Sequence, residues 1–177
     1  MNATIINPIN LFLLILGTYL GIKLSIFLLN KSTTKNNENK YLGWLIFIQS
    51  LAIIIGCLYR FDLLGYFSHL IGIQSLYHFL IGPLAYFYVR ACTQKGFKLK
   101  PILWLHFVPA LVALIYFMPF YLQSGQEKFE AYLIWRETAS LGVPRWVLLI
   151  RLFHATIYFV ICARLITIYK RHLVNAT

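Results

Sequence analysis

The chain has 177 residues, of which 60% are hydrophobic and 12% are charged, and its formal net charge is +11. Soluble domains contain about 45–50% apolar and about 25% charged residues, so this composition excludes an ordinary water-soluble domain. The lipid bilayer is the environment that covers so much apolar surface. The basic residues lie in the gaps between apolar runs and form no continuous stripe. This pattern argues against nucleic-acid contacts from the residues present.

Five apolar segments are long enough to cross a bilayer as helices, which requires about 20 mostly apolar residues. Backbone groups cannot remain unpaired in lipid, so each segment is expected to be helical. We therefore predict an all-α fold, a multi-pass transmembrane helical bundle that forms a single domain over residues 1–177. The predicted spans are residues 5–29, 41–58, 67–89, 101–122 and 143–169.

The first segment follows an N-terminal stretch without basic residues, which argues against a cleaved signal peptide. We expect this segment to remain in the membrane as the first span. Gly17 and Gly21 within it have the small-xxx-small spacing of close helix contacts. The segment is therefore a candidate for homodimer formation, in addition to its contact with the lipid bilayer.

The basic residues are divided unequally between the two sides of the predicted bundle. Cations are enriched in short cytoplasmic loops, so the richer side marks the cell interior. This predicts a membrane protein with an outward-facing N-terminus and a cytoplasmic C-terminus. The richer side holds ten cations: Lys31, Lys35, Lys40, Arg90, Lys95, Lys98, Lys100, Arg164, Lys170 and Arg171. The other side holds four cations, Arg60, Lys128, Arg136 and Arg145, together with Asp62, Glu127, Glu130 and Glu137.

The longest connection, residues 123–142, contains the sequence EKFEAYLIWRE. Its apolar residues Phe129, Leu133 and Ile134 recur at helical spacing. This pattern predicts a short amphipathic helix, which either lies on the outer face of the membrane or packs as a lid over the bundle.

Polar side chains inside the spans are the candidates for ligand or signal recognition, because ionisable groups are costly in the membrane. Arg151, His154 and Tyr158 share one face of the fifth span. No acidic residue lies within a span, so Arg151 is expected to find its partner in Glu137, Asp62, a lipid phosphate or backbone carbonyls.

His78 and His106 complete the candidate set. His78 and His154 each lie eleven residues into parallel spans, which places them at similar depth. Two facing imidazoles at one depth form a site for haem iron. The commoner alternative is that each histidine is satisfied by a neighbouring hydroxyl or carbonyl group.

Motifs of catalysis are missing from the sequence. No carboxylate pair lies in a span, and no H-E-x-x-H, P-loop or G-x-S-x-G pattern occurs. We therefore expect no enzymatic activity, no catalytic residue, no metal site and no resident cofactor.

Three segments, NKYLGWLIF, LIGPLAYFYVR and LHFVPALVALIYFMPFYL, carry a resemblance to a known family. They resemble the multi-span sensor region of bacterial membrane-bound transcription regulators of the AraC type. The matching residues are Gly82, Pro83, Tyr86, Tyr88, Val89 and Arg90, followed by His106, Phe107 and Pro109. The resemblance implies a multi-pass protein of the bacterial cytoplasmic (inner) membrane, with an outward-facing N-terminus and a cytoplasmic helix-turn-helix output domain.

That output domain is absent from this chain, which ends eight residues after the fifth predicted span. We expect the DNA-binding domain to lie in a longer product of the gene or in a separate protein. The leading hypothesis is an integral membrane sensor that passes an envelope or membrane signal to a cytoplasmic output. The alternatives are a small transporter or permease fragment, and a haem- or lipid-binding membrane protein.

Overall fold

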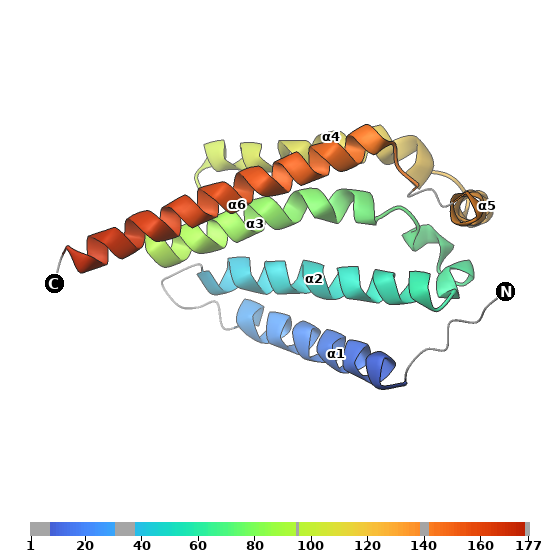
Figure 1. Ribbon diagram of the computed structural model, residues 1–177, viewed down its shortest axis with the longest axis horizontal. Coiled ribbons are helices and arrows are strands. Elements are labelled where there is room, and N and C mark those ends of the chain that lie inside the picture. The colour runs from blue at the N-terminus through green and yellow to red at the C-terminus, as the bar shows by residue number, and fades with distance from the viewer. Residues whose placement is uncertain (1–7, 31–37, 95, 139–141, 176–177) are drawn as a thin grey trace.

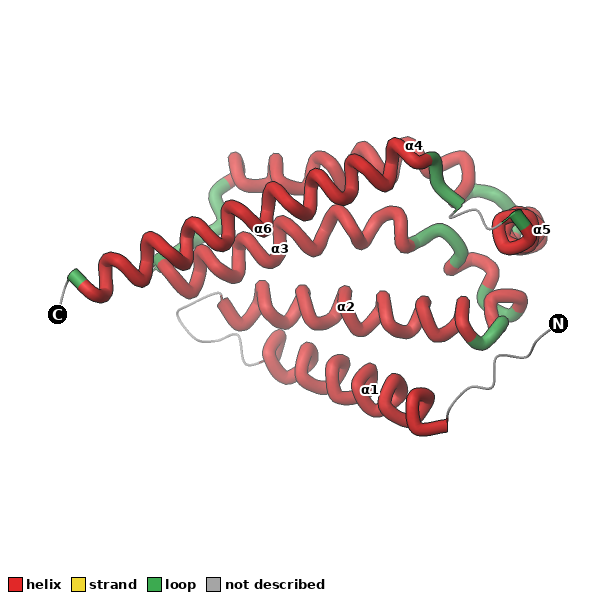
Figure 2. The backbone as a smooth tube through the Cα atoms, viewed as in Figure 1, coloured by secondary structure: helices red, strands yellow, loops and turns green. Residues whose placement is uncertain are grey.

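The computed structural model describes residues 8–30, 38–94, 96–138 and 142–175. Within these ranges every regular element is a helix, and none is a strand (Figure 2). The α-helices are α1 (Pro8–Asn30), α2 (Glu38–Arg60), α3 (Gln74–Thr93), α4 (Val108–Tyr121), α5 (Gly125–Glu137) and α6 (Arg145–Val174). Short 3-10 segments are η1 (Leu63–Gly65), η2 (Ser68–Leu70) and η3 (Pro101–Phe107).

The long helices lie side by side as a bundle, with α1 at one edge (Figure 1). Helix α1 packs on α2, α2 packs on α3, and α3 contacts both α4 and α6. Helix α5 lies across one end of the bundle, where Figure 1 looks almost along its axis. We call α5 the lid and this end the lid end. The opposite end, where α6 projects past its neighbours, is the basic end (Figure 1).

Four helical segments in the described residues are long and apolar enough to cross a membrane. They are Ile9–Asn30, Glu38–Arg60, Pro101–Tyr121 and Arg145–Val174. Their side chains are largely uncovered by protein: Phe12 is 63% exposed, Leu149 67% and Phe159 75%. Apolar surface on this scale marks contact with lipid or with other proteins. Length, composition and exposure therefore agree with a membrane protein.

Helix α3 is not among these four segments, although the sequence predicts a span over residues 67–89. It occupies the interior of the bundle and buries Phe79, Gly82, Leu84 and Phe87 against its neighbours. A helix surrounded by other helices does not require an apolar surface on every side. Its lower hydropathy therefore follows from contact with protein instead of lipid.

One predicted span boundary is wrong, whereas the fourth predicted span agrees with the apolar segment Pro101–Tyr121 and differs only in beginning as a 3-10 helix. The α-helix of the third span begins at Gln74, because residues 63–73 form the 3-10 turns η1 and η2 and a bend at Gly72, whose φ is +87°. The fourth span, predicted as one helix over residues 101–122, is a 3-10 segment up to Phe107 that continues as α4 from Val108. Pro109 lies in the first turn of α4, where its missing N–H costs little. In the first span, α1 begins at Pro8, and residues 5–7 lie outside the described ranges.

The lid confirms the short helix predicted in residues 123–142. Ser124 caps it through a capping box: Ser124 Oγ accepts from the Glu127 N–H, and the Glu127 carboxylate accepts from the Ser124 N–H. Its apolar side packs on the turns before α3, where a buried cluster joins Leu64, Ile71 and Tyr132. The helix therefore packs on the bundle, which is the second of the two arrangements that the sequence left open.

Candidate functional site

The contact between α3, η3 and α6 brings together most of the polar and aromatic residues predicted from the sequence. We call this set the α3–α6 junction: Gly82, Tyr86, His106, His154 and Tyr158. His106 Nδ1 lies 2.7 Å from Tyr158 Oη, which is a hydrogen bond between η3 and α6. The Tyr86 ring lies 4.8 Å from the His106 ring, and the His154 ring lies 4.8 Å from the Tyr158 ring, measured between centroids.

Gly82 is the residue that allows the two helices to approach this closely. A Cβ atom added at Gly82 would lie 2.6 Å from Tyr158 Cδ2 and 3.2 Å from His154 Cε1. Neither distance leaves room for a methyl group, so α3 and α6 can pack this closely only because residue 82 has no side chain. Pro83, next to it, is fully buried. The Gly-Pro pair of the family resemblance therefore has a direct packing role.

Arg90 lies on the basic-end side of the junction and contacts Tyr86. Its Nη1 donates to Tyr86 Oη at 3.0 Å, and its Nε and Nη2 both donate to Gln94 Oε1. The guanidinium also lies over the Phe97 ring, 4.8 Å from its centroid. Arg90 is thus fixed by contacts within α3 and the following turn, and it positions the Tyr86 ring against His106.

His154 is buried among aromatic rings with no hydrogen-bond partner on either ring nitrogen. Its nearest ring neighbours are Tyr158 and Phe79, the latter 5.2 Å away between centroids. His78 has a different environment: it is exposed, it stacks on Tyr77, and its Nδ1 pairs with the Gln74 carbonyl one turn earlier. The two imidazoles face different neighbours, so the described structure does not support the haem arrangement.

Arg151 lies near the lid end of α6, one turn before His154. Its Nε and Nη2 atoms are buried and have no hydrogen-bond partner. Tyr77, His78 and Tyr121 are close enough to interact with it electrostatically. Of the predicted partners, Asp62 pairs instead with Arg136. In the described part of the chain, Arg151 therefore carries a buried charge without a carboxylate.

Lys128 is a second buried cation, and the sequence analysis treated it only as a loop charge. It is 2% exposed, and its ammonium group donates to the Tyr121 carbonyl at 2.8 Å and to His69 Nδ1 at 3.5 Å. Both acceptors are neutral. The side chain thus fastens the lid to the end of α4 and to η2. Its burial depends on the packing of the lid on η2, so no local signal in the sequence separated it from the other loop cations.

The charged groups on the outside of the lid have ordinary surface roles. Hydrogen bonds from Ser124 lower the pKa of the exposed Glu127. The carboxylate of Asp62 raises the pKa of Arg136, and burial is the main cause of the raised pKa of Tyr132. The Arg136–Asp62 pair is about half exposed, and exposed pairs contribute little to stability.

The remaining predicted residues lie outside the junction. Tyr88 interacts with Cys92 one turn later in α3. Gly21, proposed for a dimer contact, packs within the chain, because a Cβ there would lie 2.4 Å from Ser50 Oγ on α2. Gly17 has no atom within 4 Å of such a Cβ and remains open.

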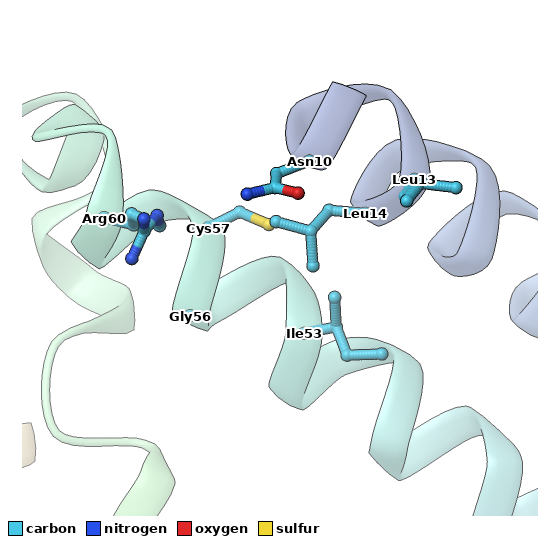
Figure 3. Close-up of a pocket in the computed structure, with 7 residues that line it drawn as sticks. All are labelled: Asn10, Leu13, Leu14, Ile53, Gly56, Cys57 and Arg60. Atoms are coloured by element: carbon cyan, nitrogen blue, oxygen red, sulfur yellow. The ribbon is translucent and has the colours of Figure 1, made fainter. Parts of the chain in front are cut away.

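Several grooves line the bundle surface. One of about 640 Å³ lies between α1 and α2 at the lid end and contains none of the candidate residues (Figure 3). A second, of about 330 Å³, lies between α4 and α6 and is almost entirely apolar; its lining includes Phe79, Val112, Phe117, Val147 and Ile150. This α4–α6 groove is adjacent to the candidate site, because Phe79 contacts His154 and Val147 lies one turn before Arg151.

No family model, no curated protein and no solved structure matches this chain. The described residues also contain no group of three or more His, Cys, Asp or Glu side chains placed to hold a metal ion. The junction, the lid and the cations Arg151 and Lys128 are therefore the features that bear on function.

Proposed function

We propose that this chain is an integral membrane signalling module, the sensor region of a membrane-bound AraC-type transcription regulator. The lid end is its input and the basic end is its output. The protein acts without catalysis, and its role is to change the activity of a cytoplasmic DNA-binding partner or domain. The sequence resemblance supports the regulator class, and the following features of the fold support the direction of signalling.

The observation that carries the proposal is the path of α6. This one helix bears Arg151 towards the lid end, His154 and Tyr158 at the junction, and Arg164, Lys170 and Arg171 towards the basic end. Its 30 residues extend about 45 Å, well beyond a hydrocarbon core of about 30 Å. A shift of α6 at the lid end is therefore transmitted to a segment outside the bundle, as in other helix-shift switches.

We propose five spans, with α3 completing the set. Its 20 residues cover about 30 Å, and it runs beside α2 and α6. The loop cations counted from the sequence support an outward-facing lid end. The start of α2, whose first turn holds Lys40, and the end of α3, which is followed by Lys98, lie at the basic end, which we therefore assign to the cytoplasm (Figure 1).

Cysteine accessibility tests this orientation. In a chain whose native cysteines Cys57, Cys92 and Cys162 are replaced by serine, Gln126→Cys in the lid should react with an impermeant maleimide on intact cells. Lys98→Cys should react only after the cells are opened. Both sites are exposed, so access to the reagent depends on the side of the membrane. Labelling of Lys98→Cys on intact cells would reverse the proposed direction of signalling.

The DNA sequence around this gene tests whether the protein belongs to the proposed class of regulators. We expect the same reading frame, or an adjacent gene, to encode a helix-turn-helix domain of the AraC type. A kinase or permease domain in that position would refute the proposal. In the source bacterium, Tyr158→Phe should alter a discrete set of transcripts, whereas Tyr169→Phe, on the exposed side of α6, should not. Comparable levels of the two variant proteins in the membrane serve as the control.

A further inference from the structure

A third groove, which we call the α2–η3 groove, lies at the basic end of the bundle, where α2 begins (Figure 1). Its volume is about 520 Å³, within the range of about 300–1,000 Å³ of small-molecule sites. The lining is almost wholly apolar and includes the buried Leu84 and Phe87 of α3. Lys40, in the first turn of α2, is the one charged side chain in the described lining. A cation and an apolar wall therefore belong to the same groove.

The length of the groove distinguishes between two kinds of occupant. Along α2 its lining begins at Lys40 and ends at Ile48, eight positions and about 12 Å further into the bundle. A hydrocarbon core of about 30 Å consists of two leaflets of about 15 Å each. The groove thus has about the depth of one leaflet. A spanning helix of a partner protein would need contact across both leaflets, whereas an acyl chain occupies only one. The length therefore favours a lipid chain whose headgroup lies at the Lys40 end.

Lys40 has no carboxylate partner among the residues that the structure describes. Glu38, two positions earlier, interacts instead with Tyr88 and Cys92 of α3. Residues two positions apart on a helix do not share a face, so Glu38 and Lys40 point to different neighbours. No acidic residue is present in the described lining of the groove. A headgroup at Lys40 therefore meets a cation that no described carboxylate neutralises.

A neighbouring pocket adds positive charge at the same end. It has a volume of about 440 Å³, and Arg90, Lys98 and Lys100 line it without an acidic residue in the described lining. Leu99, between the two lysines, lines the α2–η3 groove, so residues 98–100 border both spaces. Basic pockets between helices at a membrane surface are typical sites for anionic lipid headgroups. The charge therefore favours an anionic lipid over a zwitterionic one.

We propose that the α2–η3 groove binds an anionic phospholipid, with the headgroup phosphate at Lys40 and one acyl chain beside Trp44 and Trp104. These two tryptophans line the groove and are 49% and 60% exposed. Tryptophan is enriched at the membrane–water interface, where the upper part of an acyl chain also lies. The inference goes beyond the proposed function. It requires a membrane around the bundle, but neither the regulator role nor a particular orientation.

Quenching of tryptophan fluorescence by brominated lipids tests the site, because bromine on an acyl chain quenches only tryptophans close to it. The protein is reconstituted in phosphatidylcholine vesicles that contain increasing fractions of brominated phosphatidylglycerol or brominated phosphatidylcholine. In wild type, the relative affinity for phosphatidylglycerol should be about fivefold higher, the effect of one lysine beside an anionic headgroup. Lys40→Met should remove most of this preference. Lys170→Met, at an exposed position near the basic end of α6, should retain it.

The tryptophans show whether the preference arises in the groove. Trp44→Phe combined with Trp104→Phe should remove the part of the quenching that is selective for phosphatidylglycerol, whereas Trp135 and Trp146, near the lid end, should respond equally to both lipids. Glycerol phosphate, which has the anionic head without the chains, should not compete.

Three results would overturn the proposal: equal quenching by both lipids in wild type, an unchanged preference in Lys40→Met, or competition by glycerol phosphate. If neither brominated lipid quenches Trp44 and Trp104, protein covers the groove and the lipid site is refuted as well. The assay does not measure transcription, so its failure would leave the proposed signalling role unaffected.

Discussion

His106 and Tyr158 lie 52 positions apart in the chain, yet His106 Nδ1 and Tyr158 Oη are 2.7 Å apart. This hydrogen bond connects η3, at the start of the fourth span, to the middle of α6. The Tyr158 ring also closes the space above Gly82. One tyrosine therefore joins three segments, and its hydroxyl and its ring can be tested separately.

Tyr158→Phe removes the hydroxyl and keeps the ring. We expect the free energy of unfolding to fall by about 1 kcal/mol, the usual net contribution of one hydrogen bond. Thermal unfolding in detergent, followed by circular dichroism, measures the change. Tyr169→Phe is the matched control, because Tyr169 is an exposed residue of the same helix. An equal effect of the two substitutions would contradict the role assigned to the His106–Tyr158 bond.

Gly82→Ala tests the close approach of α3 and α6. Its Cβ would lie 2.6 Å from Tyr158 Cδ2 and 2.9 Å from Tyr158 Cγ, so the helices must separate or the ring must turn. Overpacking of this kind costs about 1–3 kcal/mol. Gly56→Ala in α2 provides the comparison, since nothing lies within 4 Å of a Cβ there and alanine favours the helix. We expect the first variant to unfold at a lower temperature than wild type, and the second to be unchanged or more stable.

The capping box of the lid makes a prediction about pH. Hydrogen bonds from Ser124 lower the pKa of Glu127 in the folded protein below the ordinary glutamate value of 4.5. A carboxyl group with a lowered folded pKa stabilises the fold above its unfolded pKa, and this contribution is lost as pH falls through the folded value. Hydrogen exchange of the lid amides, corrected for intrinsic rates, should therefore show weaker protection in acid below about pH 4.5.

Glu127→Gln separates the charge from the geometry. Glutamine retains the hydrogen-bonding side of the capping box but does not titrate in this range. The variant lid should lack the component of the acid response that Glu127 contributes. If wild type and Glu127→Gln lose protection over the same pH range and to the same extent, another group controls the lid in acid.

The sequence predicted the features that depend on local pattern. Apolar runs of sufficient length gave the first, second and fifth spans to within a few residues of α1, α2 and α6, and helical spacing of Phe129, Leu133 and Ile134 gave the lid. Gly82 and Pro83 were singled out by a family resemblance, and both are buried in the structure.

Features that depend on contacts between distant segments were not predictable in the same way. The turns before α3 are apolar enough to extend a span, but Gly72 and the hydrogen bonds to Tyr59 and Tyr121 bend the chain there. Asp62 was one of four partners expected for Arg151, because of its charge, whereas in the structure it pairs with Arg136 of the lid. In the sequence, Lys128 does not differ from the other loop lysines. Its burial follows from the packing of the lid on η2.

Lys128 provides the last test, which concerns how the lid is held. Lys128→Ala removes both the ammonium group and its buried aliphatic stem, so the Tyr121 carbonyl and His69 lose their donor. We expect local opening of the lid to become easier by about 2 kcal/mol, or about thirtyfold in the exchange rates of α5 amides. Lys128→Met, which keeps the stem, should have a smaller effect, and Lys170→Ala, exposed near the basic end of α6, should have none. Unchanged protection of α5 in Lys128→Ala would show that the apolar cluster of Leu64, Ile71 and Tyr132 holds the lid without the lysine.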